Sequence, residues 1–146
     1  MEKFLLLALF GICMAHFEGV TVVYLRRALG ITNSQSNKEF FKKIDKNYIL
    51  IEKTREIATI LILVILALLV GEKWLDMMVV FLWTFAFWDL FYYLSLYILI
   101  RWPPNFTTVD VLFLIPRPWI APVWIPIGIS SITIIIITIL LLTSNL

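Results

Sequence analysis

One stretch decides the fold of this chain: WLDMMVVFLWTFAFWDLFYYLSLYILIR, residues 74–101. A helix needs about 20 mostly apolar residues to cross the hydrocarbon core of a bilayer. Before Arg101, only Asp76 and Asp89 bring charge into this run. It also lacks the pattern of membrane β-strands, which are alternating segments of about 10 residues. The stretch therefore predicts a membrane-spanning α-helix.

Three further runs of the same kind lie at residues 4–27, 48–70 and 121–142. Hydrophobic residues make up 62% of the chain and charged residues 15%, and the mean hydropathy is +0.97. A soluble domain has about half apolar and a quarter charged residues, so no separate soluble domain is expected. The sequence predicts an all-α fold: a polytopic membrane protein with one domain, residues 1–146, and about four transmembrane helices in a bundle.

Lysine and arginine predict the orientation of the four spans. If the loop at residues 30–47 and the connection before the last span are cytoplasmic, that side carries ten of the 12 Lys and Arg residues. The opposite side carries only Lys3 and Lys73. Because cytoplasmic loops hold an excess of positive charge, we expect a multi-pass protein of the cell membrane with both termini on the non-cytoplasmic side.

The loop at residues 30–47 contains a second membrane-directed pattern. Phe40, Phe41 and Ile44 follow helical spacing among the lysines of residues 38–46, which is typical of a helix that lies on a membrane surface. Its lysines would bind anionic lipid headgroups. A positive-inside loop with two aromatic anchors explains the same residues equally well.

A short segment at residues 107–118 separates the third span from the last. Pro103 ends the third helix, because the residue before a proline is disfavoured in the α region. Thr107 then resembles the N-cap of a short apolar turn that continues to Ile115. We expect the segment to lie at the cytoplasmic interface or to re-enter the membrane. Arg117 within it is either a ligand for a lipid phosphate or an ordinary positive-inside arginine.

Ionisable side chains inside the spans point most directly to function, because charge is costly there and usually serves a purpose. At about 1.5 Å of helical rise per residue, Glu18, Arg55, Glu56 and Asp89 lie roughly 12–18 Å from the cytoplasmic ends of three spans. We therefore expect one polar intramembrane cluster, formed by Glu18, Glu52, Arg55, Glu56, Asp89, Tyr92 and Tyr93. Thr59 continues the polar stripe of the second span. His16 points roughly opposite to Glu18 and is a weaker contributor.

Three interpretations of this cluster stay open. In the first, Arg55 lies between carboxylates of several spans and clamps the helices together. In the second, Glu18, Glu56 and Asp89 hold a metal ion. We do not expect this, because His16 is the only histidine and the Glu-x-x-His pairs of carboxylate metal bundles are missing. In the third, the carboxylates and tyrosines relay protons or bind a cation or a lipid headgroup.

The sequence favours a non-enzymatic role, in which a small integral membrane protein binds a lipid, an ion or a partner protein through the buried cluster. Two alternatives stay open: a membrane-embedded enzyme with a carboxylate metal or acid–base site, and a structural subunit of a larger membrane complex. Four helices enclose little space, so an oligomer or a complex partner is also considered. The sequence carries no phosphate loop, dinucleotide fingerprint or nucleic-acid motif. We therefore expect no nucleic-acid partner and name no cofactor.

Overall fold

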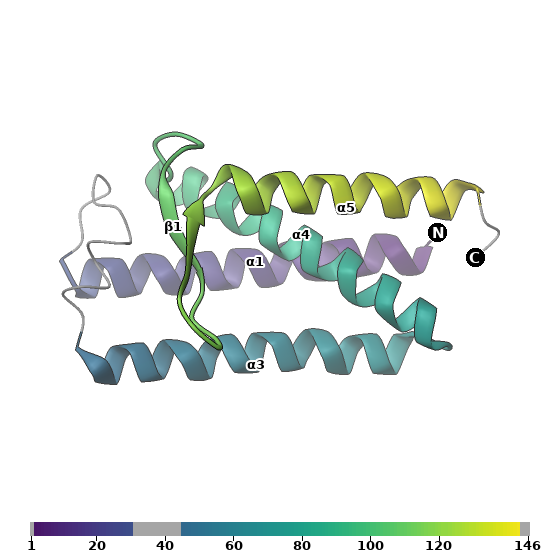
Figure 1. The fold of residues 1–146 in the computed structure, drawn as a ribbon, viewed down its shortest axis with the longest axis horizontal. Coiled ribbons are helices and arrows are strands. Elements are labelled where there is room, and N and C mark those ends of the chain that lie inside the picture. The colour runs from purple at the N-terminus through teal and green to yellow at the C-terminus, as the bar shows by residue number, and fades with distance from the viewer. Residues whose placement is uncertain (1, 31–44, 144–146) are drawn as a thin grey trace.

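The chain folds into a bundle of long helices that run in alternating directions (Figure 1), and a computed structural model describes residues 2–30 and 45–143. The helices are α1 (Glu2–Ala28), α3 (Lys46–Val70), α4 (Trp74–Ile100) and α5 (Trp124–Thr143). Each lies where the sequence predicts a span, and no end differs from the predicted limit by more than about three residues. The start of α1 and the end of α5 lie at the same end of the bundle (Figure 1).

Three of these helices, α1, α4 and α5, are long and apolar enough to cross a membrane. α3 is of similar length, but its first half carries charged residues, among them Glu52, Arg55 and Glu56. Its uncharged part covers residues 57–70, which rise about 21 Å. That is less than the roughly 30 Å of a hydrocarbon core. By length and composition, the structure therefore supports three membrane-spanning helices among the described residues.

α1 and α4 form the most extensive helix contact, and small residues on α1 explain it. Gly11, Ala15 and Gly19 recur at every fourth position, a spacing that lets two membrane helices approach closely. Ala15 is fully buried. A Cβ atom on Gly11 would lie 2.9 Å from the carbonyl oxygen of Thr84 in α4. α4 is the centre of the bundle, since it also contacts α3 and α5.

The segment before α5 is a β-hairpin, so the helical turn expected at residues 107–115 is wrong. Strand β1 (Val109–Phe113) pairs in antiparallel fashion with β2 (Trp119–Pro122). The valines of the first strand favour extended backbone, and the proline-rich turn that follows separates two short apolar runs, as in other hairpins. Because the second strand extends to Pro122, the last helix begins at Trp124 and not at residue 121.

The hairpin crosses the bundle near the start of α5 and reaches α3 (Figure 1). Its inner side packs on α4, where the rings of Phe113 and Phe85 stack with their centroids 6.2 Å apart. Trp119 of the second strand stacks on Phe113 in turn, at 6.5 Å. The hairpin is therefore part of the packed bundle, and it closes one side of the space between α3 and α4.

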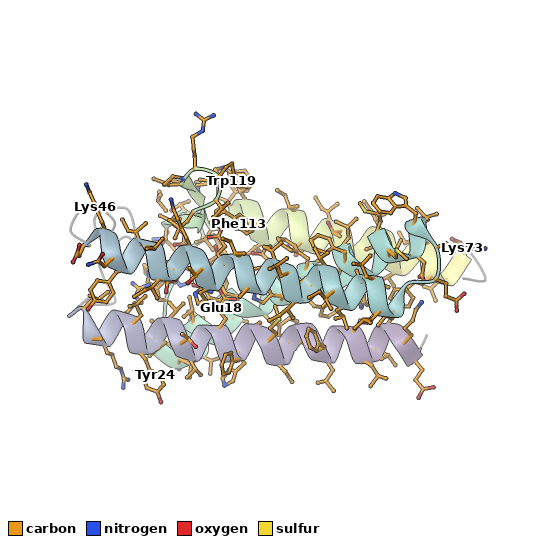
Figure 2. All side chains as sticks on the ribbon, turned by 90° about the horizontal axis from the view of Figure 1, so that it is seen from below. Glu18, Tyr24, Lys46, Lys73, Phe113 and Trp119 are labelled. Carbon is orange, nitrogen blue, oxygen red and sulfur yellow. The ribbon has the colours of Figure 1, made fainter. Side chains whose placement is uncertain are left out.

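The buried side chains are mostly apolar and include one polar group, and the outer surface of the helices is apolar as well. Glu18 points from α1 towards α3, whereas Tyr24 on the same helix points away from the bundle (Figure 2) and is 68% exposed. Lys46 and Lys73 lie at opposite ends of α3 (Figure 2). Exposed leucines and isoleucines cover most of the rest of the helices, as expected for surfaces that meet lipid.

The predicted surface helix at residues 38–46 lies mostly outside the described residues. Of its positions, the structure describes Asp45 and Lys46. Asp45 is the N-cap of α3, and its side chain accepts a hydrogen bond from the backbone N–H of Asn47 at 3.4 Å. Binding of anionic lipid headgroups by this segment therefore stays a prediction.

Candidate functional site

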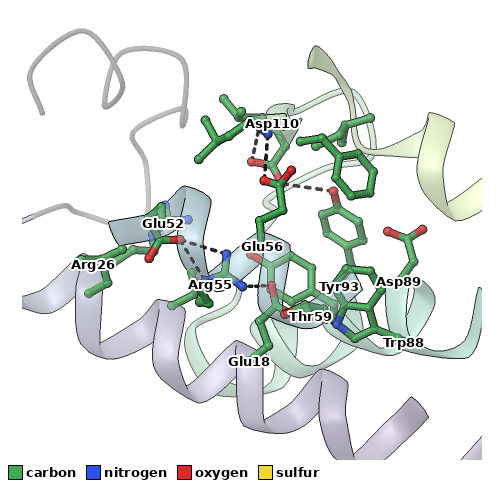
Figure 3. Close-up of a pocket in the computed structure, with 17 residues that line it drawn as sticks. Glu18, Arg26, Glu52, Arg55, Glu56, Thr59, Trp88, Asp89, Tyr93 and Asp110 are labelled. Carbon is green, nitrogen blue, oxygen red and sulfur yellow. Dashed lines mark hydrogen bonds and ion pairs between the residues drawn. The ribbon is translucent and has the colours of Figure 1, made fainter. Parts of the chain in front are cut away.

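A polar cavity of about 100 Å³ lies between α1, α3, α4 and β1. Figure 3 shows its side chains converging from the helices and the hairpin. The charged residues that line it are Glu18, Arg26, Glu52, Arg55, Glu56, Asp89 and Asp110. Thr59, Tyr92 and Tyr93 complete the polar part of the wall. All seven residues expected to form the cluster thus face one cavity, together with Thr59.

Arg55 connects two of the helices at this cavity. One of its Nη atoms pairs with Oε1 of Glu18 on α1. Its Nε and second Nη atoms both donate to Oε2 of Glu52, at 3.0 and 2.9 Å, one turn away on α3. The other oxygen of Glu18 accepts a hydrogen bond of 2.7 Å from the indole Nε1–H of Trp88 on α4. Side chains of three helices are therefore joined through one carboxylate and one guanidinium.

Glu56 does not take part in the ion pairs of Arg55, although the two residues are adjacent on α3. Its side chain faces the hairpin. Its two carboxylate oxygens accept the backbone N–H groups of Leu114 and Ile115, at 2.8 and 3.1 Å. Both groups follow the end of β1. The N–H of buried Leu114 needs an acceptor, since buried backbone donors are almost always paired. Glu56 is 9% exposed, and among the described residues it forms no ion pair. It anchors the hairpin to α3.

Two aspartates complete the acidic wall. Asp110 of β1 is 2% exposed; it accepts hydrogen bonds from the hydroxyl of Tyr93 at 3.1 Å and from the backbone N–H of Val111 at 2.8 Å. Asp89 of α4 accepts a hydrogen bond of 2.7 Å from the hydroxyl of Ser130 on α5. These contacts connect the cavity wall to the hairpin and to the last helix.

Two sequence candidates lie outside the cavity, and three residues with polar side-chain atoms in its wall were not among the candidates. His16 is exposed and lies 3.4 Å from the hydroxyl of Ser95 through its Nδ1 atom, and Arg117 is exposed in the hairpin turn. The residues that sequence reasoning missed are Arg26, Trp88 and Asp110. A signal existed for Asp110, since it is the single charged residue in the apolar run at residues 106–115.

Arg26 illustrates why the charge pattern alone was misleading. Its position at the end of a span is that of an ordinary positive-inside arginine, yet it is only 4% exposed. Its guanidinium lies over the ring of Trp102, 4.7 Å from the ring centroid, a favourable cation–π geometry. Arg26 thus adds a positive charge to the wall of the cavity.

The carboxylates considered for a metal, Glu18, Glu56 and Asp89, all line the cavity but bond to different partners. Among the described residues, no group of three or more His, Cys, Asp or Glu side chains is arranged to hold a metal ion. The cavity instead combines five carboxylates with two guanidiniums, which gives a formal charge of −3 if every group is ionised. This composition suits a cationic ligand with hydrogen-bond donors.

The chain matches no family model, no curated protein and no solved structure at a significant level. Resemblance therefore assigns it no function. The chemistry of the cavity is the basis on which a function can be argued, because it is where the buried charges of the described chain converge.

Proposed function

We propose that the chain crosses the cell membrane four times and binds a small cationic amine in the polar cavity. α3 is the fourth span in this proposal, because it runs beside the other helices (Figure 1) and a short turn joins it to α4. Its outward side chains are apolar, with Leu61, Ile65 and Leu68 more than half exposed, at 52%, 52% and 57%. Lipid would cover these side chains in a bilayer.

The length of α5 supports a position for the cavity near the membrane surface. Its 20 residues rise about 30 Å, which equals the thickness of the hydrocarbon core. The hairpin directly precedes this helix, and β1 forms one wall of the cavity. The cavity would then lie at the edge of the hydrocarbon core, on the side that the positive charges assign to the cytoplasm.

The proposal of a cationic ligand rests on the excess of carboxylates over guanidiniums in the cavity wall. A protonated amine would balance part of the formal charge and donate short hydrogen bonds to carboxylate oxygens. The aromatic side chains of Trp88, Tyr92 and Tyr93 also line the cavity, and aromatic faces attract organic cations. The volume of about 100 Å³ corresponds to roughly three water molecules, which suits an ammonium group on a short stem.

Calorimetric titration of the protein in lipid nanodiscs with ethylammonium chloride tests this proposal. We expect binding at one site per chain, and about tenfold weaker binding after Asp89→Asn, which removes one negative charge from the wall. Lys3→Gln is the control, because it breaks an ion pair with Asp76 at the opposite end of the bundle. If ethylammonium binds no better than potassium at equal ionic strength, the cavity is not an amine site.

A further inference from the structure

A second hollow lies outside the polar cavity, between the C-terminal half of α4, the loop that follows it and the start of α5. Its volume is about 520 Å³, and its wall is largely apolar and aromatic, with Leu90, Leu94, Tyr97, Phe106 and Ile127 among the lining residues. None of the described residues that line it is Asp, Glu, Lys or Arg. This apolar groove has a volume within the range of about 300–1,000 Å³ that is usual for ligand pockets.

Arg101 places a positive charge beside the apolar groove. It directly follows α4, and its guanidinium lies over the ring of Tyr97, 5.4 Å from the ring centroid. Because Tyr97 lines the groove, this contact holds an exposed cation next to an apolar wall. A guanidinium binds phosphate through paired, charge-assisted hydrogen bonds.

We propose that the apolar groove binds one phospholipid molecule, with an acyl chain along its wall and the phosphate at Arg101. The groove is bordered by α4 and α5, which are both long and apolar enough to cross a membrane, so in a bilayer it would lie next to acyl chains. A cation beside an apolar hollow matches an amphiphile with a negatively charged headgroup. This occupant is therefore favoured over a protein partner, which would also have to cover Arg101.

The lipid site would be a neighbour of the amine site but separate from it. Tyr93 lines both the apolar groove and the polar cavity. Its hydroxyl donates to Asp110 on the cavity side, and its ring also stacks on Trp102 with the centroids 6.3 Å apart. One buried side chain thus forms the common wall, and the proposal of a lipid site rests on groove residues and Arg101, not on the ligand of the cavity.

Titration of delipidated protein with phosphatidylglycerol, followed by native mass spectrometry, tests the proposal. We expect one retained lipid per chain, and about tenfold weaker binding after Arg101→Gln or after Leu94→Trp, which fills the groove. Arg27→Gln and Leu82→Trp are matched controls and should bind as the natural sequence does. Arg27 is an exposed arginine outside the groove, and Leu82 is 41% exposed on the same helix as Leu94, which is 45% exposed.

Diacylglycerol, which lacks the phosphate, should bind about tenfold more weakly than phosphatidylglycerol to the natural sequence. Equal retention by the natural sequence and by both groove variants would indicate only non-specific surrounding lipid and would overturn the proposal. Loss of binding after Leu94→Trp with unchanged binding after Arg101→Gln would overturn it as well, because the phosphate contact defines the ligand class. No amine is present in this titration, so its outcome is distinct from that of the ethylammonium experiment.

Discussion

Replacing Glu56 by alanine should release the β-hairpin from the helical bundle. Its carboxylate oxygens accept the backbone N–H groups of Leu114 and Ile115, at 2.8 and 3.1 Å. A hydrogen bond to a charged group contributes about 1.5–3 kcal/mol, and a buried donor left unsatisfied costs about 1–3 kcal/mol. Leu114 is buried, whereas Ile115 is exposed enough for its N–H to bond water. We therefore expect the free energy of hairpin opening to fall by about 2–4 kcal/mol.

Hydrogen exchange of the segment at residues 109–122, measured in lipid nanodiscs, reports this opening directly. A loss of about 2–4 kcal/mol corresponds to roughly 30- to 700-fold faster exchange of protected amides. Glu56→Gln keeps one carbonyl oxygen as an acceptor and should show a smaller effect. Exchange of α4, which packs closely against α1, should change little.

Glu52→Ala is the matched control for this experiment. Glu52 lies one turn before Glu56 on α3 and also lines the cavity, but its carboxylate bonds to Arg55 and not to the hairpin. If Glu56→Ala leaves the hairpin as protected as Glu52→Ala does, the carboxylate does not anchor it. The reasoning from the two backbone hydrogen bonds would then be refuted.

Two further substitutions, each with a matched comparison, test the ion pair and the helix packing by thermal unfolding in detergent. Arg55→Leu should lower the free energy of unfolding by about 1–3 kcal/mol. This lies between the values for exposed and buried ion pairs, because the Arg55 side chain is 28% exposed. An unchanged unfolding temperature would exclude the interpretation that Arg55 clamps the helices together. Lys3→Leu breaks a more exposed pair with Asp76 and should cost less than about 1 kcal/mol. Gly11→Ala should cost about 1–3 kcal/mol, because its Cβ would meet the backbone of α4. Gly128→Ala has no atom within 4 Å and should be neutral or stabilising; equal effects at both glycines would argue against a close α1–α4 contact.

The helices were predictable from the sequence because one physical quantity, the length of an apolar run, sets the length of a membrane helix. The run at residues 74–101 became α4 (Trp74–Ile100) almost without change. The hairpin was missed because Thr107 was interpreted as a helix cap, although the valines that follow it favour a strand. The difference between α3 and the other helices lies in the charged first half of α3, and an expectation based on the length of the run did not separate them.

The sequence brought together the helical carboxylates and tyrosines of the cavity, with Arg55, but it missed Arg26, Trp88 and Asp110 and did not give the pairing. Depth along each helix follows from the rise per residue, and this places Glu18, Arg55 and Asp89 at similar levels. Rotation about each helix axis does not follow from depth, so the sequence could not tell which carboxylate Arg55 meets. The partner of Glu56 could not be predicted for another reason. The backbone groups that it binds belong to a hairpin that the sequence pattern did not predict.

The two halves of α3 are attached to the bundle by different interactions, polar contacts in the first half and apolar packing in the second. Leu63 and Ala67 are its buried apolar residues and lie in the second half, whereas Glu56 is buried in the first half, beside Arg55. If either polar attachment is enough to hold the first half, Arg55→Leu and Glu56→Ala together should cost more than the sum of the single changes. Groups in contact with one element commonly show such coupling, of about 0.5–3 kcal/mol. Additive losses in a double-mutant cycle would instead mean that Glu56 holds only the hairpin and that α3 keeps its place without it.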